Sequence, residues 1–137
     1  MRIDFLFVAD AAEAIGGKIF VLGGGWDVCR SPIYPALNRL AIVAAIMFNA
    51  DEVAKTHRGR LSVSEVNGHD LIPPAEFEVH ADRGADLPSN ADARSLLALN
   101  LNLQIPGPGA YEVRLTIGEM QQATRFYAKL ITPKERG

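Results

Sequence analysis

Residues 95–105 read SLLALNLNLQI, and this stretch decides the fold class. From position 97 onward, leucine or isoleucine stands at every second position, while the positions between carry alanine, asparagine and glutamine. A strand places alternate side chains on one face, whereas a helix would scatter these five around its circumference. The stretch therefore predicts a half-buried antiparallel strand.

The same alternation with a period of two recurs along the rest of the chain. Gly16-Gly17 is a turn signal that joins two alternating stretches into a predicted hairpin. Pro106–Gly109 is a second breaker, and it separates the first two strands of a three-strand meander predicted for the C-terminal third. Further strands are predicted at residues 2–11, 18–22, 40–48, 58–66, 76–80, 111–117 and 124–131.

About eight short strands joined by Gly, Pro and Asn turns predict an all-β fold, an antiparallel β-sandwich of immunoglobulin-like or related type. At most one short helix is expected, at residues 50–56, because Asn49 and Glu52 have capping-box spacing. The length of 137 residues favours a single domain over residues 1–132. Residues 133–137 are expected to form a polar tail that frays.

One predicted strand, residues 40–48, is apolar on both faces. It is either a central strand covered twice or a strand whose outer face meets another subunit. In the second case, Ala41, Val43 and Met47 would line the interface.

The charge balance gives no sign of a polyanionic partner. Lys and Arg number 14 against 16 Asp and Glu, a net charge of -2, and the two signs are interleaved. We therefore expect neither nucleic acid nor a membrane surface as a partner, because both need clustered basic residues. The apolar run at residues 40–48 is too short to cross a bilayer as a helix, and Asp4 and Asp10 bracket the N-terminal apolar run, which is too short for a signal peptide. The cytoplasm is the expected compartment.

Two features near the glycine run at residues 23–25 are candidates for a site. The run lacks the spacing of a phosphate-binding loop, and a bulged strand end explains it better. Trp26 and Asp27 follow, and together they could form the floor of a ligand site at one end of the sandwich. Packing of the Trp26 ring over the core is the simpler interpretation.

The sequence assigns no metal site, cofactor or catalytic residue. His57, His69 and His80 lack ligand spacing, and the single cysteine, Cys29, is expected to be a buried, inert thiol. The aspartates of the polar stretch 82–92 lack the EF-hand pattern, although cation binding by that loop stays open. No serine has a nucleophile-elbow context, which favours a protein that is not an enzyme.

Tyr111 opens a strand directly after a turn, which is the placement of the tyrosine in a tyrosine corner. Its hydroxyl is therefore expected to bond to the backbone a few residues upstream. The cysteine that accompanies this motif in immunoglobulin domains is absent, since Val113 stands at that position.

Several segments together resemble a known family. The N-terminal segments are Ala9–Ala12, Gly17–Phe20, Leu22–Asp27 and Pro35, and the C-terminal ones are Leu103–Pro106, Pro108–Tyr111 and Leu115–Gly118. This pattern is similar to a bacterial family of small uncharacterised β-sandwich proteins, a domain of unknown function. The resemblance implies a fold and supplies no chemistry.

The sequence favours a non-enzymatic binding or assembly module that associates with itself or with a protein partner. The alternative is a small-molecule-binding protein or an enzyme with its site near Trp26 and Asp27. A concave pocket with converging polar groups would favour the alternative.

Overall fold

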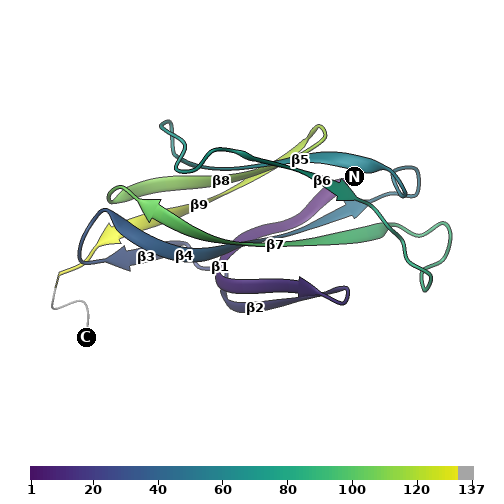
Figure 1. Cartoon of the computed structure of the whole chain (residues 1–137), viewed down its shortest axis with the longest axis horizontal. Helices are drawn as coiled ribbons and strands as arrows, with labels where there is room; N and C mark the ends of the chain where they lie inside the picture. The colour runs from purple at the N-terminus through teal and green to yellow at the C-terminus, as the bar shows by residue number, and fades with distance from the viewer. Residues whose placement is uncertain (133–137) are drawn as a thin grey trace.

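The computed structural model describes residues 1–132 as nine β-strands in two sheets (Figure 1). The predicted tail at 133–137 lies outside the described residues. The strands are β1 (Arg2–Ile15), β2 (Lys18–Gly24), β3 (Val28–Ser31), β4 (Ala36–Phe48), β5 (Thr56–Glu65), β6 (Ala75–His80), β7 (Ala93–Ile105), β8 (Gly109–Ile117) and β9 (Met120–Leu130).

The first sheet has the strand order β2-β1-β4-β7 and is antiparallel throughout. The second sheet has the order β3-β9-β8-β5-β6, and only its β3–β9 pair is parallel. The second sheet curls like a half-barrel, and the structure does not confirm an immunoglobulin-like sandwich. The prediction of an all-β fold is confirmed, and its strands form two sheets.

The main core lies between the two sheets and follows the alternation seen in the sequence. Leu103 and Ile105 of β7 are fully buried in it, and Leu97, Leu99 and Leu101 pack against it while half-buried. On the second sheet, Val113, Leu115 and Ile117 of β8 bury their side chains inward. Alternate residues from both sheets therefore supply one continuous core.

Tyr111 forms the predicted corner. Its hydroxyl donates a hydrogen bond of 2.6 Å to the carbonyl oxygen of Gly107 and lies 3.4 Å from the Gly107 N–H. Its ring stacks on Phe126, with the ring centres 5.5 Å apart. The prediction of a tyrosine corner is confirmed, and the corner anchors the β7–β8 turn to the core.

The predicted helix at residues 50–56 is wrong, since none of the residues 1–132 is helical. The local signal is nevertheless real: Glu52 N–H donates to the Asn49 carbonyl at 3.0 Å, and the Glu52 side chain accepts from the Asn49 N–H at 3.0 Å. The turn ends at Ala54, which has a φ of 67° and bonds its N–H to Ala81. The capping pattern thus closes a turn between β4 and β5.

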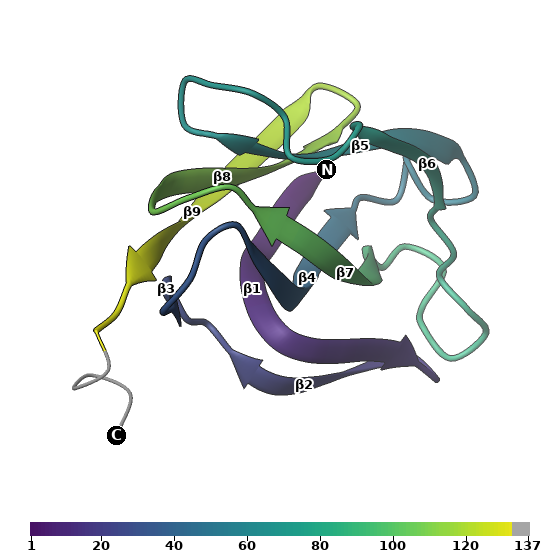
Figure 2. The same cartoon turned by 60° about the vertical axis from the view of Figure 1, so that its left-hand side comes forward.

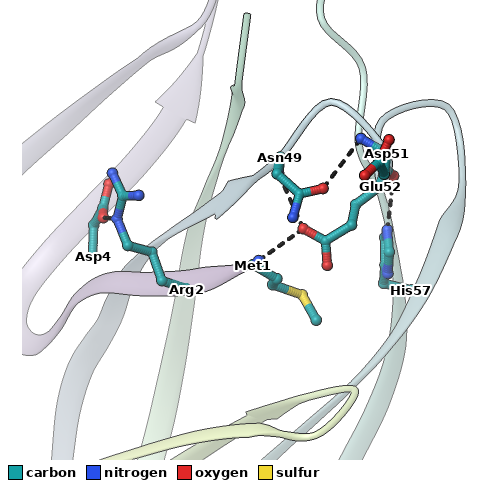
Figure 3. A network of polar contacts seen from close by, with 7 residues as sticks. All are labelled: Met1, Arg2, Asp4, Asn49, Asp51, Glu52 and His57. Carbon is teal, nitrogen blue, oxygen red and sulfur yellow. Dashed lines mark hydrogen bonds and ion pairs between the residues drawn. The ribbon is translucent and has the colours of Figure 1, made fainter.

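The same turn holds the amino group of Met1 (Figure 3). A carboxylate oxygen of Glu52 lies 2.8 Å from this ammonium, and His57 bonds through Nε2 to the Glu52 carbonyl at 3.0 Å. The hydrogen bond from the ammonium, followed by that from the Asn49 N–H, holds the pKa of Glu52 below its ordinary value. The first strand is thereby tied to the β4–β5 turn.

We expect Glu52→Gln to lower the stability at neutral pH by about 1 kcal/mol and to flatten its acid dependence. A carboxyl group with a depressed pKa contributes stability that is fully present above its unfolded pKa, about 4.3 for glutamate. That contribution is lost as the pH falls through the lower pKa of the folded state. Urea unfolding between about pH 7 and pH 3 measures this difference.

The matched control for this pH series is Asp51→Asn. Among residues 1–132 the Asp51 side chain forms no hydrogen bond or ion pair, and only its N–H bonds to the Asn49 side chain. It should leave the neutral-pH stability within about 0.5 kcal/mol of the wild type. Equal midpoints for Glu52→Gln and the wild type at both ends of the pH range would contradict the role of this ion pair.

Candidate functional site

The β1–β2 hairpin forms one edge of the first sheet. Its loop is Gly16-Gly17, with φ values of 61° and 74°, so both residues adopt the left-handed conformation that a two-residue type I′ turn requires. The loop pairs Ile15 with Lys18 and continues the ladder to Ala9 opposite Gly24. The predicted hairpin is confirmed.

The hairpin bends over the outer face of the first sheet (Figure 2). β1 pairs with β4 only from Arg2 to Ala9, whereas its pairing with β2 continues to Ile15. The second half of β1 therefore leaves β4 and carries β2 with it. A small second cluster is buried there, formed by Ala9, Ala12, Ala41 and Val43 with Phe5, Phe7, Ile19 and Ala98 packed around it.

Asn100 of β7 holds the bent hairpin in place. Its side-chain amide donates to the Ala12 carbonyl at 2.8 Å and accepts from the Ala12 N–H at 3.3 Å. The side chain thus satisfies both backbone groups of one residue, as a neighbouring strand would. This contact closes the second cluster on the β7 side.

We expect Asn100→Ala to destabilise the protein by about 1–3 kcal/mol, because it leaves two half-buried backbone groups of Ala12 without partners. Native-state hydrogen exchange should show faster exchange in β2 and the second half of β1 than in β8. Asn102→Ala is the matched control, since Asn102 lies on the same face of the same strand and is exposed. Equal exchange of the hairpin in both variants would rule out the clamp.

β2 forms an uncovered edge of the first sheet. In the described part of the chain, β2 has β1 as its single neighbour. Phe20 is 56% exposed and Leu22 is 71% exposed, and Ile15 and Val21 are also exposed. We call the segment Lys18–Leu22, with its exposed side chains, the β2 edge.

The backbone groups of the β2 edge alternate in direction. In a hairpin with a two-residue loop, the residues that flank the loop form a hydrogen-bonded pair, and every second residue repeats that arrangement. Phe20 and Leu22 therefore bond to β1, whereas Ile19 and Val21 direct their N–H and C=O groups away from it. Ala12, which lies opposite Val21, agrees with this alternation. Its N–H and C=O groups point away from β2 and bond to Asn100.

The other strand edges carry features that block pairing. β6 alternates Glu76, Glu78 and His80 on its exposed positions after Pro73-Pro74, and β3 has four residues followed by Pro32. Charged residues, prolines and short length are the devices that keep strand edges from associating. The exposed side chains of β7 are polar, and four of its five leucines lie in the core or pack against it. These four are Leu97, Leu99, Leu101 and Leu103. The β2 edge has one lysine at its end and no proline.

An open groove of about 550 Å³ runs beside the hairpin. Phe20, Leu22 and Glu13 line the hairpin side, and Arg39 of β4 and Asn100 line the other. Arg39 and Glu13 are both exposed, and neither forms an ion pair with any other residue among positions 1–132. The groove thus combines apolar side chains with one charge of each sign.

A second groove, of about 320 Å³, lies over β5 and β6. The register sets Arg58 opposite Glu78 and Arg60 opposite Glu76, so charges of opposite sign face each other across the strands. Such pairs stabilise the sheet and leave no excess of one charge. This groove is explained by strand pairing.

The structure separates Trp26 from Asp27. Trp26 packs edge-on against Phe126, with the ring centres 5.8 Å apart, and its indole N–H is buried without a hydrogen-bond partner in the described residues. Asp27 is exposed, and its carbonyl accepts from the Tyr127 N–H at 2.8 Å. The two side chains do not meet in either groove described above, and ligand binding by them stays a prediction.

The outer face of β4 is covered within the chain. Ala41 and Val43 are fully buried under the bent hairpin, and Met47 is half-buried nearer the end of the strand. Of the two alternatives for this strand, the structure shows the one in which both faces are covered. A subunit contact through Ala41 and Val43 would require the hairpin to move away.

The remaining candidate groups lie apart from the hairpin. Burial raises the pKa of the Cys29 thiol, which keeps it protonated at neutral pH. Within residues 1–132, no cluster of three or more His, Cys, Asp or Glu side chains could hold a metal ion. No helix in the described part of the chain is long and apolar enough to span a bilayer.

Sequence reasoning predicted β2 as a strand but missed its exposed edge. The signal that could have found it is the run Ile19-Phe20-Val21-Leu22, which is apolar on both faces like β4 but much shorter. Such a run needs cover on both faces, and a hairpin at the edge of a sheet cannot supply both. The exposure follows from strand order, which local patterns do not contain.

The structure is thus an all-β fold of two packed sheets, the first of which ends in a strand with exposed apolar side chains. Residues 4–128 match a family described as of unknown function, DUF6941, and the chain belongs to this family. The resemblance to an uncharacterised domain family is therefore confirmed. No curated protein matches the chain.

Proposed function

We propose that the protein is a non-enzymatic binding or assembly module and that the β2 edge is its interaction surface. The observation that supports this most strongly is the exposure of Phe20 and Leu22 on a strand whose outer backbone groups have no partner strand among residues 1–132. Exposed apolar side chains on an open strand edge favour pairing with another chain.

The energetic argument rests on apolar area. Covering an exposed leucine or phenylalanine contributes on the order of 1.5–3 kcal/mol for a complete burial, and the β2 edge offers several partly exposed ones. A strand added to the edge would also satisfy the free N–H and C=O groups of Ile19 and Val21. Main-chain pairing then gives affinity, and the side chains of alternate residues give specificity.

The polar groups of the described residues support a role other than catalysis. The hydrogen bonds and charge of Arg2, with a contribution from Arg94, hold the pKa of Asp4 below its ordinary value, and Glu52 bonds to the Met1 ammonium. Burial raises the pKa of Tyr111, whose hydroxyl is committed to Gly107. Each of these groups has a partner that fixes the fold.

The proposed compartment is the cytoplasm, and the proposed partners are proteins. One cysteine with a protonated thiol fits a reducing environment, in which no disulfide is needed. The interleaved charges and the net charge of -2 favour a protein partner over nucleic acid.

The test is site-specific photo-crosslinking in the cells that produce the protein. A photoreactive residue at position 20 should give a discrete adduct with a protein, and the same residue at the exposed Leu87, in the β6–β7 loop, should not. An adduct that disappears when Leu22→Ser is added would support the β2 edge as the interaction surface. Equal or absent adducts at both positions would remove the proposal.

A further inference from the structure

We infer that the occupant of the β2 edge is a second copy of this chain, paired antiparallel with β2 of the first across a two-fold axis at Phe20. This inference rests on the proposed function, because it names the partner that the β2 edge takes. It follows from the direction of the backbone groups, the length of regular strand and the placement of charge.

The direction of the backbone groups limits the possible registers. Ile19 and Val21 point their N–H and C=O groups outward, and a partner strand must present outward groups at the opposite positions. In a symmetric antiparallel pair, the two-fold axis can therefore lie at Phe20, which sets Ile19 opposite the partner's Val21. It can also lie at Ile19 or at Val21, which sets that residue opposite its own copy. If the partner strand is shifted by one residue, each outward-facing residue lies opposite a residue whose N–H and C=O groups are already bonded to β1.

The length of regular strand selects between these registers. Gly16-Gly17 ends the straight segment on one side, and Gly23, with a φ of 60°, bends it on the other. The regular segment is thus Lys18–Leu22, and its middle residue is Phe20. Only the register with Phe20 on the axis pairs this whole segment with itself. An axis at Val21 would set Ile19 opposite the bent Gly23, and an axis at Ile19 would set Val21 opposite Gly17 of the turn.

This register gives four backbone hydrogen bonds, two for each pairing of Ile19 with the partner's Val21. Phe20 then lies opposite the partner's Phe20 in a pair without backbone hydrogen bonds, where side chains approach most closely, at about 4.5–5.5 Å between Cβ atoms. Aromatic rings at this spacing stack or meet edge to face. The two exposed phenylalanines cover one another.

The charges of the segment agree with a pairing of identical strands. Lys18 lies opposite the partner's Leu22, so its alkyl chain covers the exposed leucine while its ammonium stays in water. The two Lys18 residues are then four residues apart along the strands, about 13 Å at 3.3 Å per residue. Glu13, the cross-strand neighbour of Phe20, is separated from the partner's Glu13 by three strand spacings, about 14 Å.

Both separations exceed the Debye length of about 8 Å at physiological ionic strength, so like charges do not oppose the pairing. The contact spans five residues from each chain, fewer than the 20–30 of a standard interface. We therefore expect a reversible dimer whose Kd lies in the micromolar range or above. The first sheet of one copy would join the first sheet of the other into one continuous sheet across an isologous interface.

The test measures self-association of the purified chain by sedimentation equilibrium from about 1 to 500 µM. Two variants should raise the Kd at least tenfold. Val21→Pro removes an outward N–H that the monomer does not use, and Phe20→Glu sets two like charges directly opposite each other. Leu87→Glu is the control, because it places the same charge on an exposed apolar residue outside the β2 edge, and its Kd should match the wild type.

The register is tested by oxidation of single-cysteine variants in a Cys29→Ser background. Phe20→Cys should form a disulfide-linked dimer, since opposed residues of such a pair have the Cα spacing of a disulfide. Val21→Cys should not, because its opposite residue is Ile19. A disulfide at position 21 and none at position 20 would overturn the register.

Two further outcomes would overturn the second copy as occupant. One is a wild-type chain that stays monomeric at the highest concentration, and the other is a dimer that Val21→Pro and Phe20→Glu leave intact. If, in either case, the photoreactive residue at position 20 crosslinks a different protein, the proposed function stands and only this inference fails. A dimer lost in both variants and a crosslink of the chain to itself would support both.

Discussion

Val43→Asp is expected to prevent folding or to lower the stability by about 4 kcal/mol or more. Val43 is fully buried in the second cluster, between β4 and the bent hairpin, and the described residues around it are apolar. A carboxylate there would be desolvated without a partner, a change that costs several kcal/mol. The total stability of a domain of this size is about 5–15 kcal/mol.

Leu37→Asp is the matched control, since Leu37 lies on the same strand and the same face but is 75% exposed. It should shift the urea midpoint by less than the equivalent of about 0.5 kcal/mol. Circular dichroism and urea unfolding measure both variants. If Val43→Asp were as stable as Leu37→Asp, the hairpin would not cover β4 in solution, and the outer face of β4 would again be a candidate subunit contact.

Phe126→Ala is expected to cost about 3–5 kcal/mol. Phe126 is fully buried on β9 and touches the two aromatic residues that flank it, stacking on Tyr111 and meeting Trp26 edge to face. Removal of its ring leaves a cavity between Tyr111 of β8 and Trp26, which precedes β3. Urea unfolding with an unchanged m-value would report this loss directly.

The neighbouring residue provides the control for this substitution. Tyr127 lies next along β9 on the opposite face and is exposed, so Tyr127→Ala should cost under about 1 kcal/mol. Losses of equal size in the two variants would mean that the β9 side chains do not alternate between core and solvent. That result would contradict the register of β9 with β8.

Local patterns predicted the strands that alternate clearly. The leucines of β7 and the residues of β8 that face the core point inward as their spacing indicates, and Gly16-Gly17 forms the expected turn. These features succeed because each depends on neighbours within a few residues. The double cover of β4 was one of two open alternatives, because the sequence shows that both faces are apolar but not what covers them.

The features that the sequence did not reveal depend on distant partners. β3 has four residues among prolines, and it becomes a strand because it pairs with β9 about a hundred residues later. The capping pattern at Asn49 and Glu52 suggested a helix, but the turn ends at Ala54, where the chain bonds to Ala81. The exposed β2 edge likewise depends on which strand lies beside which.

The clamp between Asn100 and Ala12 joins residues that are 88 positions apart. During synthesis, the first hairpin leaves the ribosome early and can close its own turn at once, but the side chain that docks it is made only when β7 is made. The order of synthesis therefore delays docking of the hairpin until β7 is made, and the inner face of β4 stays open until β8 and β9 complete the core.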